Sequence, residues 1–218
     1  MRRFHSNYFL HGLALIGVRA VLGVGSERGS PFNIQRSLHV PNLTLDDLAD
    51  VFAGEKLNLS ALLQRYREYL QRLEAKGLSP WQGQPRRSDL HLTEAVGHFH
   101  LYAWLRQAVG RLCIVSPEFP TGNPDEMVLP EFHWASGKVD LCIICKGKKG
   151  IIEVKSFVDK SDLEKSLEQA ATYASSLELS EVTLAVFVPT KDQEILDTLS
   201  TRQEIEGVLV QVEAIGWG

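Results

Sequence analysis

Two short apolar segments with a glycine turn between them constrain the fold of this chain most. Residues 138–146 and 150–157 are rich in Val, Ile and Cys, and Gly147-Lys148-Lys149 joins them. Two such segments around a turn predict an antiparallel β-hairpin. Apart from a few charged positions its strands are apolar on both faces, which is typical of strands that other elements cover on both sides. We therefore expect a sheet with helices packed against it.

The predicted elements around this hairpin indicate an α/β fold. The order from residue 88 is α-β-β-β-α-β with further elements beyond it, which predicts a mixed sheet flanked by helices. The helix after the hairpin is expected to open with a capping box formed by Ser161 and Glu164. The other predicted elements are a helix at 89–109, strands at 111–117 and 182–188, a short helix at 192–199 and a last strand at 208–212.

The first 87 residues have a different pattern. Apolar segments at roughly 13–24 and 34–40 flank a turn-rich stretch and predict a hairpin, and Thr44 is a predicted helix N-cap. A helix is predicted over 60–76, with an apolar stripe on one side. The segment 78–87 is rich in Pro and Gly, as loops are. We therefore divide the chain into an N-terminal hairpin and helical connector, 1–87, and a second domain, 88–218.

The charge and the cysteine content of the chain limit its possible functions and compartments. The 27 acidic residues exceed the 23 basic ones, giving a net charge of −4, whereas proteins that coat nucleic acid carry a basic excess. Three cysteines give no disulfide framework and predict a reducing, cytoplasmic compartment. Cys142-x-x-Cys145 lacks the second pair of a zinc site, so core cysteines are expected. The apolar run at 8–24 contains His11 and Arg19, and we expect no membrane span there.

Charged side chains interrupt the apolar hairpin. Asp140 begins the first strand, and Glu153 and Lys155 share one face of the second strand because side chains alternate. Carboxylates in such strands are costly unless something pairs with them. Two carboxylates and one ammonium at one spot suit a divalent cation with an activated water. The alternative is an ordinary salt bridge between Glu153 and Lys155 at a strand edge.

The spacing of these residues resembles a known nuclease signature. Gly137-x-x-Asp140 is followed, after twelve residues, by Glu153-Val154-Lys155. This pattern is similar to that of the PD-(D/E)XK nuclease superfamily, whose core also has the order α-β-β-β-α-β. The resemblance implies a restriction-endonuclease-like core and covers about 88–190.

The two helices beside this hairpin carry further matching residues. Gln169-Ala170-Ala171-Thr172-Tyr173 resembles the Gln-x-x-x-Tyr motif of the RecB-like branch, and its i, i+4 spacing puts the two polar side chains on one face. In the preceding helix Glu94 matches the acidic residue of the family, and His98 matches a histidine that RecB-like members use. A satisfied, semi-buried structural histidine is the alternative for His98. His100 lies on another face, and we expect it to be structural.

Glu118 ends the strand before a long loop. Bacterial proteins that join an AAA-ATPase-like region to a C-terminal nuclease of this superfamily have a similar strand-end glutamate, so an ATPase-like partner or fused region is a candidate. The chain itself has no Gly-x-x-x-x-Gly-Lys-Ser/Thr loop. An insertion at roughly 123–135 separates Glu118 from Gly137 and leaves the role of Glu118 undecided.

The resemblance implies a deoxyribonuclease that depends on Mg²⁺ or Mn²⁺ and hydrolyses phosphodiester bonds of nucleic acid, DNA rather than RNA. One alternative is a catalytically inactive module of the same fold that binds nucleic acid or interacts with another protein. A second is a different hydrolase with a site of Glu94, Glu118 and His98. The implied metal ligands are Asp140, Glu153 and Glu94, with His98 and the Val154 carbonyl as further candidates; Lys155 would orient the attacking water, Gln169 and Tyr173 would position the substrate, and Lys148 and Lys149 are candidate phosphate contacts.

Overall fold

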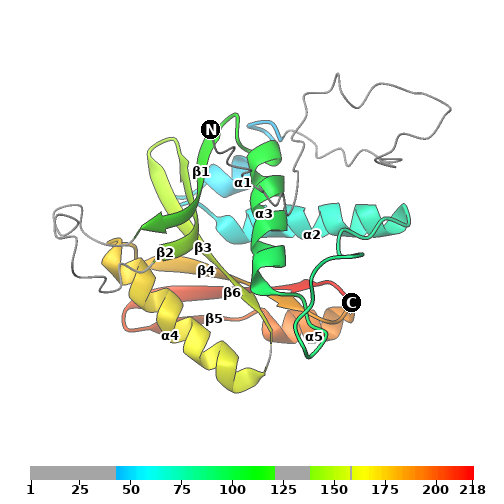
Figure 1. Ribbon diagram of the computed structural model, residues 1–218. Helices are drawn as coiled ribbons and strands as arrows, with labels where there is room; N and C mark the ends of the chain where they lie inside the picture. Colours follow the sequence, from blue (N-terminus) through cyan, green and yellow to red (C-terminus); the bar gives the residue numbers. More distant parts are fainter. Residues whose placement is uncertain (1–42, 121–137, 158) are drawn as a thin grey trace, which may run out of the picture. The chain divides into compact units, whose positions relative to one another are not determined.

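The computed structural model describes residues 43–120, 138–157 and 159–218 (Figure 1). These residues all belong to one compact unit, Val40–Gly218. The predicted N-terminal hairpin and the insertion after residue 120 lie outside the described residues. In chain order the elements are α1 (Ala49–Phe52), α2 (Leu59–Ala75), α3 (Glu94–Ala108), β1 (Cys113–Pro120), β2 (Lys138–Cys145), β3 (Lys148–Ser156), α4 (Lys160–Ser176), β4 (Glu181–Val188), α5 (Gln193–Leu199), β5 (Arg202–Ile205) and β6 (Val208–Gly216).

The six strands form one mixed sheet in the order β1-β2-β3-β4-β6-β5. β1, β2 and β3 are antiparallel neighbours, β3, β4 and β6 run parallel, and β5 pairs antiparallel with β6. This confirms the predicted α/β class with a mixed sheet flanked by helices. β5 is not predicted from the sequence, because its four residues are exposed or only partly buried and so show no apolar alternation.

The hairpin between β2 and β3 has a tighter turn than expected. Lys146 and Gly147 form a two-residue loop, and both have positive φ angles, 49° and 77°. Turns of this kind match the right-handed twist of the flanking strands. The turn therefore starts one residue earlier than predicted, and Lys148 and Lys149 belong to β3.

Helices cover both faces of the sheet (Figure 1). On one face, α1, α2 and α3 pack against the sheet and form a first cluster of buried apolar side chains. On the other, α4 and Leu196 of α5 form a second cluster. The predicted stripe of α2 is confirmed, because its six members are all buried: Leu62, Leu63, Tyr66, Tyr69, Leu70 and Leu73. Each fully buried side chain of this size contributes roughly 1.5–3 kcal/mol to folding.

The connector helix shares a core with the rest of the unit. α2 contacts β4 and β6, and the Tyr66 ring lies 5.3 Å from that of Trp104 and 6.4 Å from that of Phe187, measured between centroids. The boundary predicted at residue 87 therefore falls inside one compact unit. Whether either side folds alone stays a prediction.

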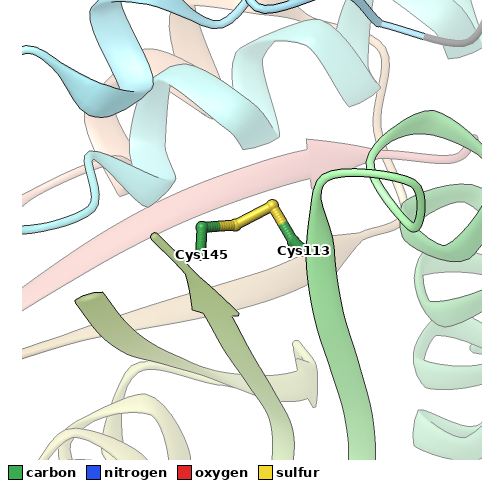
Figure 2. Close-up of a disulfide and its surroundings, with 2 residues drawn as sticks. All are labelled: Cys113 and Cys145. Carbon is green, nitrogen blue, oxygen red and sulfur yellow. A yellow bond between two sulfur atoms is a disulfide. The ribbon is translucent and has the colours of Figure 1, made fainter. Parts of the chain in front are cut away.

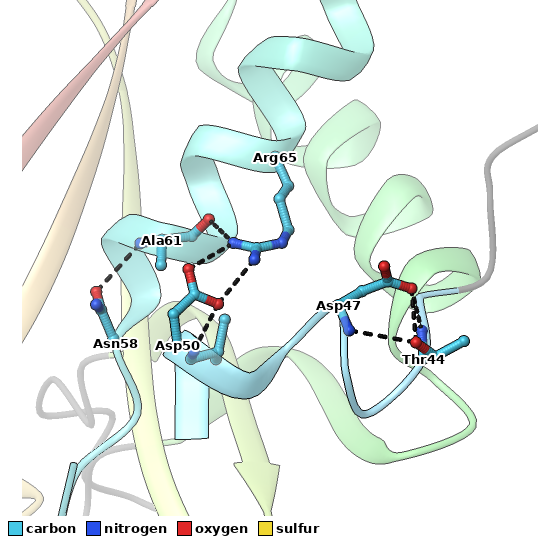
Figure 3. Close-up of polar contacts among 7 residues, drawn as sticks. Thr44, Asp47, Asp50, Asn58, Ala61 and Arg65 are labelled. Carbon is cyan, nitrogen blue, oxygen red and sulfur yellow. Dashed lines mark hydrogen bonds and ion pairs between the residues drawn. The ribbon is translucent and has the colours of Figure 1, made fainter. Parts of the chain in front are cut away.

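Local capping sets where the first helices begin. Thr44 Oγ1 accepts a hydrogen bond from the Asp47 N–H at 3.2 Å, and Asp47 Oδ2 accepts one from the Thr44 N–H at 2.8 Å (Figure 3). This reciprocal pair closes a turn ahead of α1. The prediction of Thr44 as a helix N-cap is therefore wrong, because α1 begins only at Ala49 and Leu48 is its N-cap residue. Figure 3 also shows Asn58, which caps α2, and the Arg65–Asp50 ion pair that ties α1 to α2.

Two predicted helix starts are wrong. α3 begins at Glu94 rather than at residue 89, because Leu90 has a φ of 65° and Leu92 pairs with Arg86 in an isolated bridge. α4 begins at Lys160, because the side chain of Asp159 accepts the Asp162 N–H at 2.9 Å and takes the N-cap position. The expected capping box of Ser161 and Glu164 is therefore not the start of this helix.

None of the helices that the structure describes combines the length and apolar character needed to cross a bilayer.

Cys113 and Cys145 form a disulfide, which corrects the expectation that all three cysteines are unpaired core residues (Figure 2). The two are direct register partners of β1 and β2, with Cα atoms 4.5 Å apart, although they lie 32 positions apart in the sequence. Cys142 is free and buried, as expected. Because disulfides are typical of oxidising compartments, the cysteine content no longer supports the cytoplasmic location, which stays a prediction.

Reduction of this disulfide should lower the free energy of unfolding by about 3–4 kcal/mol, the size expected for a cross-link over a loop of this length. Urea unfolding with and without a phosphine reductant measures the loss. The Cys142→Ala variant should lose as much as the wild type, whereas Cys113→Ala/Cys145→Ala should not respond to reductant. Equal stability of the wild type in both conditions would contradict the cross-link.

His100 is structural, as the sequence predicted. Its Nδ1 lies 2.6 Å from the Tyr66 hydroxyl oxygen, and its ring centroid lies 4.8 Å from that of Trp81. Burial lowers the pKa of His100 to about 4.

His100 should therefore make stability fall in acid. An unfolded histidine titrates near pH 6.5, so between about pH 6.5 and 4 the unfolded chain binds the proton that the folded chain refuses. We expect a loss on the order of 2 kcal/mol across this window, beyond the loss from other groups. Urea unfolding at pH 7 and pH 5 should show a shallower pH dependence for His100→Gln than for the wild type. The matched variant His91→Gln should keep the steeper dependence.

Candidate functional site

The predicted carboxylates lie where β2 and β3 separate. The antiparallel ladder between these strands ends at the pair Leu141 and Ile152. Beyond it, side chains take the place of ladder partners. Asp140 Oδ2 accepts the Val154 N–H at 2.7 Å, and Glu153 Oε1 accepts the Asp140 N–H at 3.2 Å. Both carboxylates are thus fixed against the backbone of the opposite strand.

Lys155 and Glu94 meet beside this pair. Lys155 follows two positions after Glu153 on β3, and its Nζ lies 3.4 Å from Oε1 of Glu94. Glu94 is the first residue of α3, where the helix dipole favours a negative charge. The two ends of this ion pair come from elements that are far apart in the sequence. β3 is an interior strand of the sheet, so the alternative of a salt bridge at a strand edge does not describe this arrangement.

The surroundings of these carboxyl groups disfavour their negatively charged forms. Glu153 is only 2% exposed, and burial, together with the neighbouring Asp140 carboxylate, raises the pKa of Glu153 to about 8. Burial also raises the pKa of Glu94, against the opposing effect of Lys155. Burial acts to lower the pKa of Lys155, but Glu94 and the other carboxylates outweigh it and the pKa is raised. Three carboxyl groups therefore compete for one ammonium.

His98 contacts the backbone of the site. Its Nε2 lies 3.0 Å from the carbonyl oxygen of Asp140, so this nitrogen is the donor. His98 comes one helical turn after Glu94 on α3, so the same helix presents Glu94 to Lys155 and holds Asp140 by its main chain. This contact fits the alternative of a satisfied structural histidine, and a role of His98 as a metal ligand stays a prediction.

Two contacts that could not be predicted from the sequence fix α3 against β3. The hydroxyl of Ser156 donates to the Leu92 carbonyl at 2.7 Å, and His91 Nδ1 lies 3.0 Å from the Phe157 carbonyl oxygen. These bonds hold the segment before Glu94 to the end of β3. The one sequence signal for them is a polar residue, Ser156, that ends an apolar strand.

Gln169 and Tyr173 lie on one face of α4, as predicted. Gln169 Nε2 donates to the Tyr173 hydroxyl at 3.0 Å. Gln169 is exposed, and Tyr173 packs partly against the second apolar cluster. Their described hydrogen bond is with each other, not with the carboxylates.

The two candidate phosphate contacts, Lys148 and Lys149, lie away from the carboxylates. Lys148 Nζ donates to the carbonyls of Phe52, at 3.0 Å, and Gly54. Lys148 and the exposed Lys149 begin β3, roughly 15 Å from Glu153 along the strand at the usual rise per residue.

Glu118 is exposed, and its Oε2 lies 3.4 Å from Lys138 Nζ. This ion pair is its described polar contact. The alternative site of Glu94, Glu118 and His98 is therefore not brought together by the contacts that the structure describes.

The carboxylate pair has the chemistry of a partial metal site. No group of three or more His, Cys, Asp or Glu residues with metal-ligand geometry occurs within the described ranges. Asp140 Oδ1 and Glu153 Oε2 accept no hydrogen bond from described residues, in contrast to the other oxygen of each carboxylate. Mg²⁺ usually binds one or two carboxylates and keeps several waters. The pair therefore fits Mg²⁺ or Mn²⁺ better than a cation that needs a full protein cage.

Comparison with protein-family models, with curated proteins and with solved structures finds no match to this chain. The nuclease signature thus remains a resemblance of motifs, and the function has to be argued from the site itself.

The Glu153→Gln variant should be more stable than the wild type at pH 8 in the presence of a chelator. A carboxyl whose folded pKa lies near 8 contributes stability below its unfolded pKa of about 4.5, and this is lost as the pH rises toward 8. The amide oxygen of Gln can still accept the Asp140 N–H. We expect a gain of about 1–3 kcal/mol at pH 8 and little difference near pH 4.5. Thermal and urea unfolding measure it, with the exposed Glu164→Gln as an unchanged control; a loss of stability at pH 8 would contradict this electrostatic picture.

Proposed function

We propose that this protein is a Mg²⁺- or Mn²⁺-dependent nuclease with a restriction-endonuclease-like core. The observation that carries the proposal is the pair of carboxylates, Asp140 and Glu153, at the point where β2 and β3 separate. The ion pair of Lys155 and Glu94 lies beside it. The order α3-β1-β2-β3-α4-β4 supports it, because this is the order that the superfamily resemblance implies. The resemblance also favours DNA over RNA as the substrate.

The charge of the site supports the need for a cation. The raised pKa values of Glu153 and Glu94 mean that these carboxyl groups favour a further positive charge beside them, a proton or a cation, and a phosphodiester is itself an anion. In this proposal Asp140 and Glu153 hold the divalent ion, with the Val154 carbonyl as a further ligand. When bound, such an ion offsets the charge of the phosphate and makes a water more acidic. Substrate binding should therefore be weak in a chelator.

Lys155 has the properties of a group that orients rather than one that accepts a proton. Its raised pKa keeps the ammonium charged at neutral pH, and Glu94 fixes the ammonium at 3.4 Å. An ammonium in this position can donate hydrogen bonds to the attacking water and to a phosphate oxygen, where negative charge develops in the transition state. Glu94 then acts through Lys155, and His98 acts through the main chain of Asp140.

Gln169 and Tyr173 are the proposed substrate contacts outside this group. The amide and the hydroxyl are hydrogen-bonded to each other, and together they offer donors and acceptors to a phosphate or a base. Their part would be to hold the strand, so their loss should raise KM more than it lowers kcat.

The wild type should cleave DNA with Mg²⁺ or Mn²⁺ and not in a chelator, leaving 5′-phosphate ends. The Lys155→Ala variant should lose at least about 10²-fold in kcat, because it removes the only ammonium of the site among the described residues. Gel assays on labelled single- and double-stranded DNA measure both. Lys76→Ala, which removes an exposed lysine at the C-terminal end of α2, is the matched control and should keep full activity.

Two outcomes would overturn the proposed nuclease activity. DNA binding by the wild type without any cleavage at saturating Mn²⁺ would favour the alternative, an inactive module that keeps the fold. Full activity of Lys155→Ala would place the chemistry elsewhere in the chain. Glu153→Gln distinguishes loss of function from loss of fold, because it should be inactive and yet more stable.

A further inference from the structure

A small hairpin over residues 86–92 leads directly into the candidate site. Its ends, Arg86 and Leu92, pair in an isolated antiparallel bridge. One residue separates Leu92 from Glu94, which begins α3 and pairs with the site lysine, so the hairpin and the site are continuous in the chain. We call residues 86–92 the arginine hairpin.

The arginine hairpin is fixed to the end of β3 that carries Lys155. The Leu92 carbonyl accepts a hydrogen bond from the hydroxyl of Ser156 at 2.7 Å, and His91 Nδ1 lies 3.0 Å from the carbonyl oxygen of Phe157. Ser156 and Phe157 are the two residues that follow Lys155. Hydrogen bonds on both sides of the sequence gap therefore hold the arginine hairpin beside the site.

These contacts bound the distance from Arg86 to the site. Paired Cα atoms across an antiparallel bridge are about 5 Å apart, and two residues span at most about 7 Å, so the Cα atoms of Arg86 and Glu94 lie within roughly 12 Å of each other. A nucleic-acid strand advances about 3.4 Å per nucleotide in B-form geometry. A strand with one phosphate at the carboxylates therefore places another phosphate beside the arginine hairpin within about three or four nucleotides.

Arg86 holds its guanidinium in a fixed and accessible position. The guanidinium carbon lies 4.4 Å from the centroid of the Trp217 ring, and Nη2 donates to the Trp81 carbonyl at 3.3 Å. Stacking on an aromatic face restrains the side chain and leaves its charge intact. Arg86 is exposed and forms no ion pair with the residues that the structure describes. A guanidinium carries five N–H donors, so most of them are open to an acceptor from a ligand.

Arg87 brings a second guanidinium to the same hairpin. Its Nη2 lies 3.3 Å from Oδ2 of Asp89, and the two side chains are 40% and 38% exposed. An ion pair as exposed as this one contributes only about 0–1 kcal/mol, so an incoming anion can share or replace it. The two arginines and Asp89 leave one positive charge in excess, in a chain whose net charge is −4. The arginine hairpin is therefore suited to an anion.

The turn of the arginine hairpin is strained at an exposed residue. Leu90 has a φ of 65°, in the left-handed region, and its side chain is 75% exposed. This conformation costs roughly 1–2 kcal/mol for a residue other than glycine, and burial of the side chain does not offset it. Strain of this kind gathers at ligand clamps and active sites, where it holds a segment ready for its ligand.

We infer that the arginine hairpin binds a backbone phosphate of the nucleic-acid substrate, a few nucleotides from the scissile one, through the guanidinium groups of Arg86 and Arg87. The inference rests on the proposed function, because it takes the scissile phosphate to lie at Asp140 and Glu153. Phosphate oxygens match the planar fork of a guanidinium, which binds them in pairs. Such contacts fix the register of the strand and carry no sequence preference.

The salt dependence of cleavage tests the inference. Arg86→Gln/Arg87→Gln should raise KM for labelled DNA about tenfold and leave kcat within about twofold of the wild type. Each phosphate contact contributes about 0.9 to the slope of log affinity against log salt, so the slope for KM should fall by about 1–2. A loss of fold would lower kcat and would not change this slope in a graded way, and urea unfolding checks the stability directly.

Arg106→Gln/Arg111→Gln removes the same charge and is the matched control. Arg106 lies in the last turn of α3 and Arg111 just beyond it, at the opposite end of the helix from Glu94, and both are exposed. This variant should keep the wild-type KM and salt slope. An unchanged salt slope in Arg86→Gln/Arg87→Gln overturns the inference, and so does an equal change in both double variants.

Fluorescence anisotropy of a labelled oligonucleotide at fixed Mn²⁺ separates this inference from the proposed nuclease. In the Lys155→Ala background, Arg86→Gln/Arg87→Gln should weaken binding about tenfold. Cleavage by the wild type without any effect of the two arginines overturns this inference alone. Binding by the wild type without cleavage overturns the nuclease, and the tenfold loss then still supports the arginine hairpin as a strand contact. No binding at all overturns both.

Discussion

The hydrogen bond from the Val154 N–H to Asp140 Oδ2 determines the geometry of the whole candidate site. β3 has to leave β2, an antiparallel neighbour, while it continues beside β4, a parallel one. Parting strands leave backbone groups without ladder partners, and buried groups of this kind need acceptors. Asp140 supplies one, and Glu153 accepts the Asp140 N–H in return. The carboxylates thus complete the sheet with one oxygen each, and the other oxygen accepts no hydrogen bond from the described residues.

Burying the Glu153 carboxyl in this arrangement lowers the stability of the fold. Glu153 is buried next to another carboxylate, and its pKa is raised to about 8 for that reason. An amide would make the same backbone contact without the charge. Ionisable groups at positions where an amide would fold better are a mark of functional sites, because activity and stability then make different demands on one residue. The Lys155–Glu94 pair offsets only part of the charge.

Patterns with a fixed local period allowed much of the fold to be predicted. The stripe of α2 and the alternation of β3 depend on neighbours within one element, so the sequence carries them directly. The Cys113–Cys145 pair depends on the register between two strands, which no local pattern encodes. The predicted start of α4 was wrong for a local reason: Asp159 and Ser161 are both good N-cap residues, and it is the Asp159 side chain that accepts the Asp162 N–H. In the site, the resemblance of motifs placed Glu94 in the same group as Lys155, 61 positions away. Neither the contact of His98 with the Asp140 carbonyl nor the hydrogen bond from Ser156 to the Leu92 carbonyl could be predicted from the sequence.

The carboxylate group lies toward the edge of the sheet where the parallel strands end. β3, β4 and β6 run parallel, so their carboxyl ends, at Ser156, Val188 and Gly216, lie along the same side. β2 is antiparallel to β3, so Asp140, near the start of β2, lies toward that side too. Ligands of open α/β sheets bind outside the carboxyl ends of parallel strands. The mixed sheet therefore adds a carboxylate from an antiparallel strand to the edge at which parallel strands present their ligands.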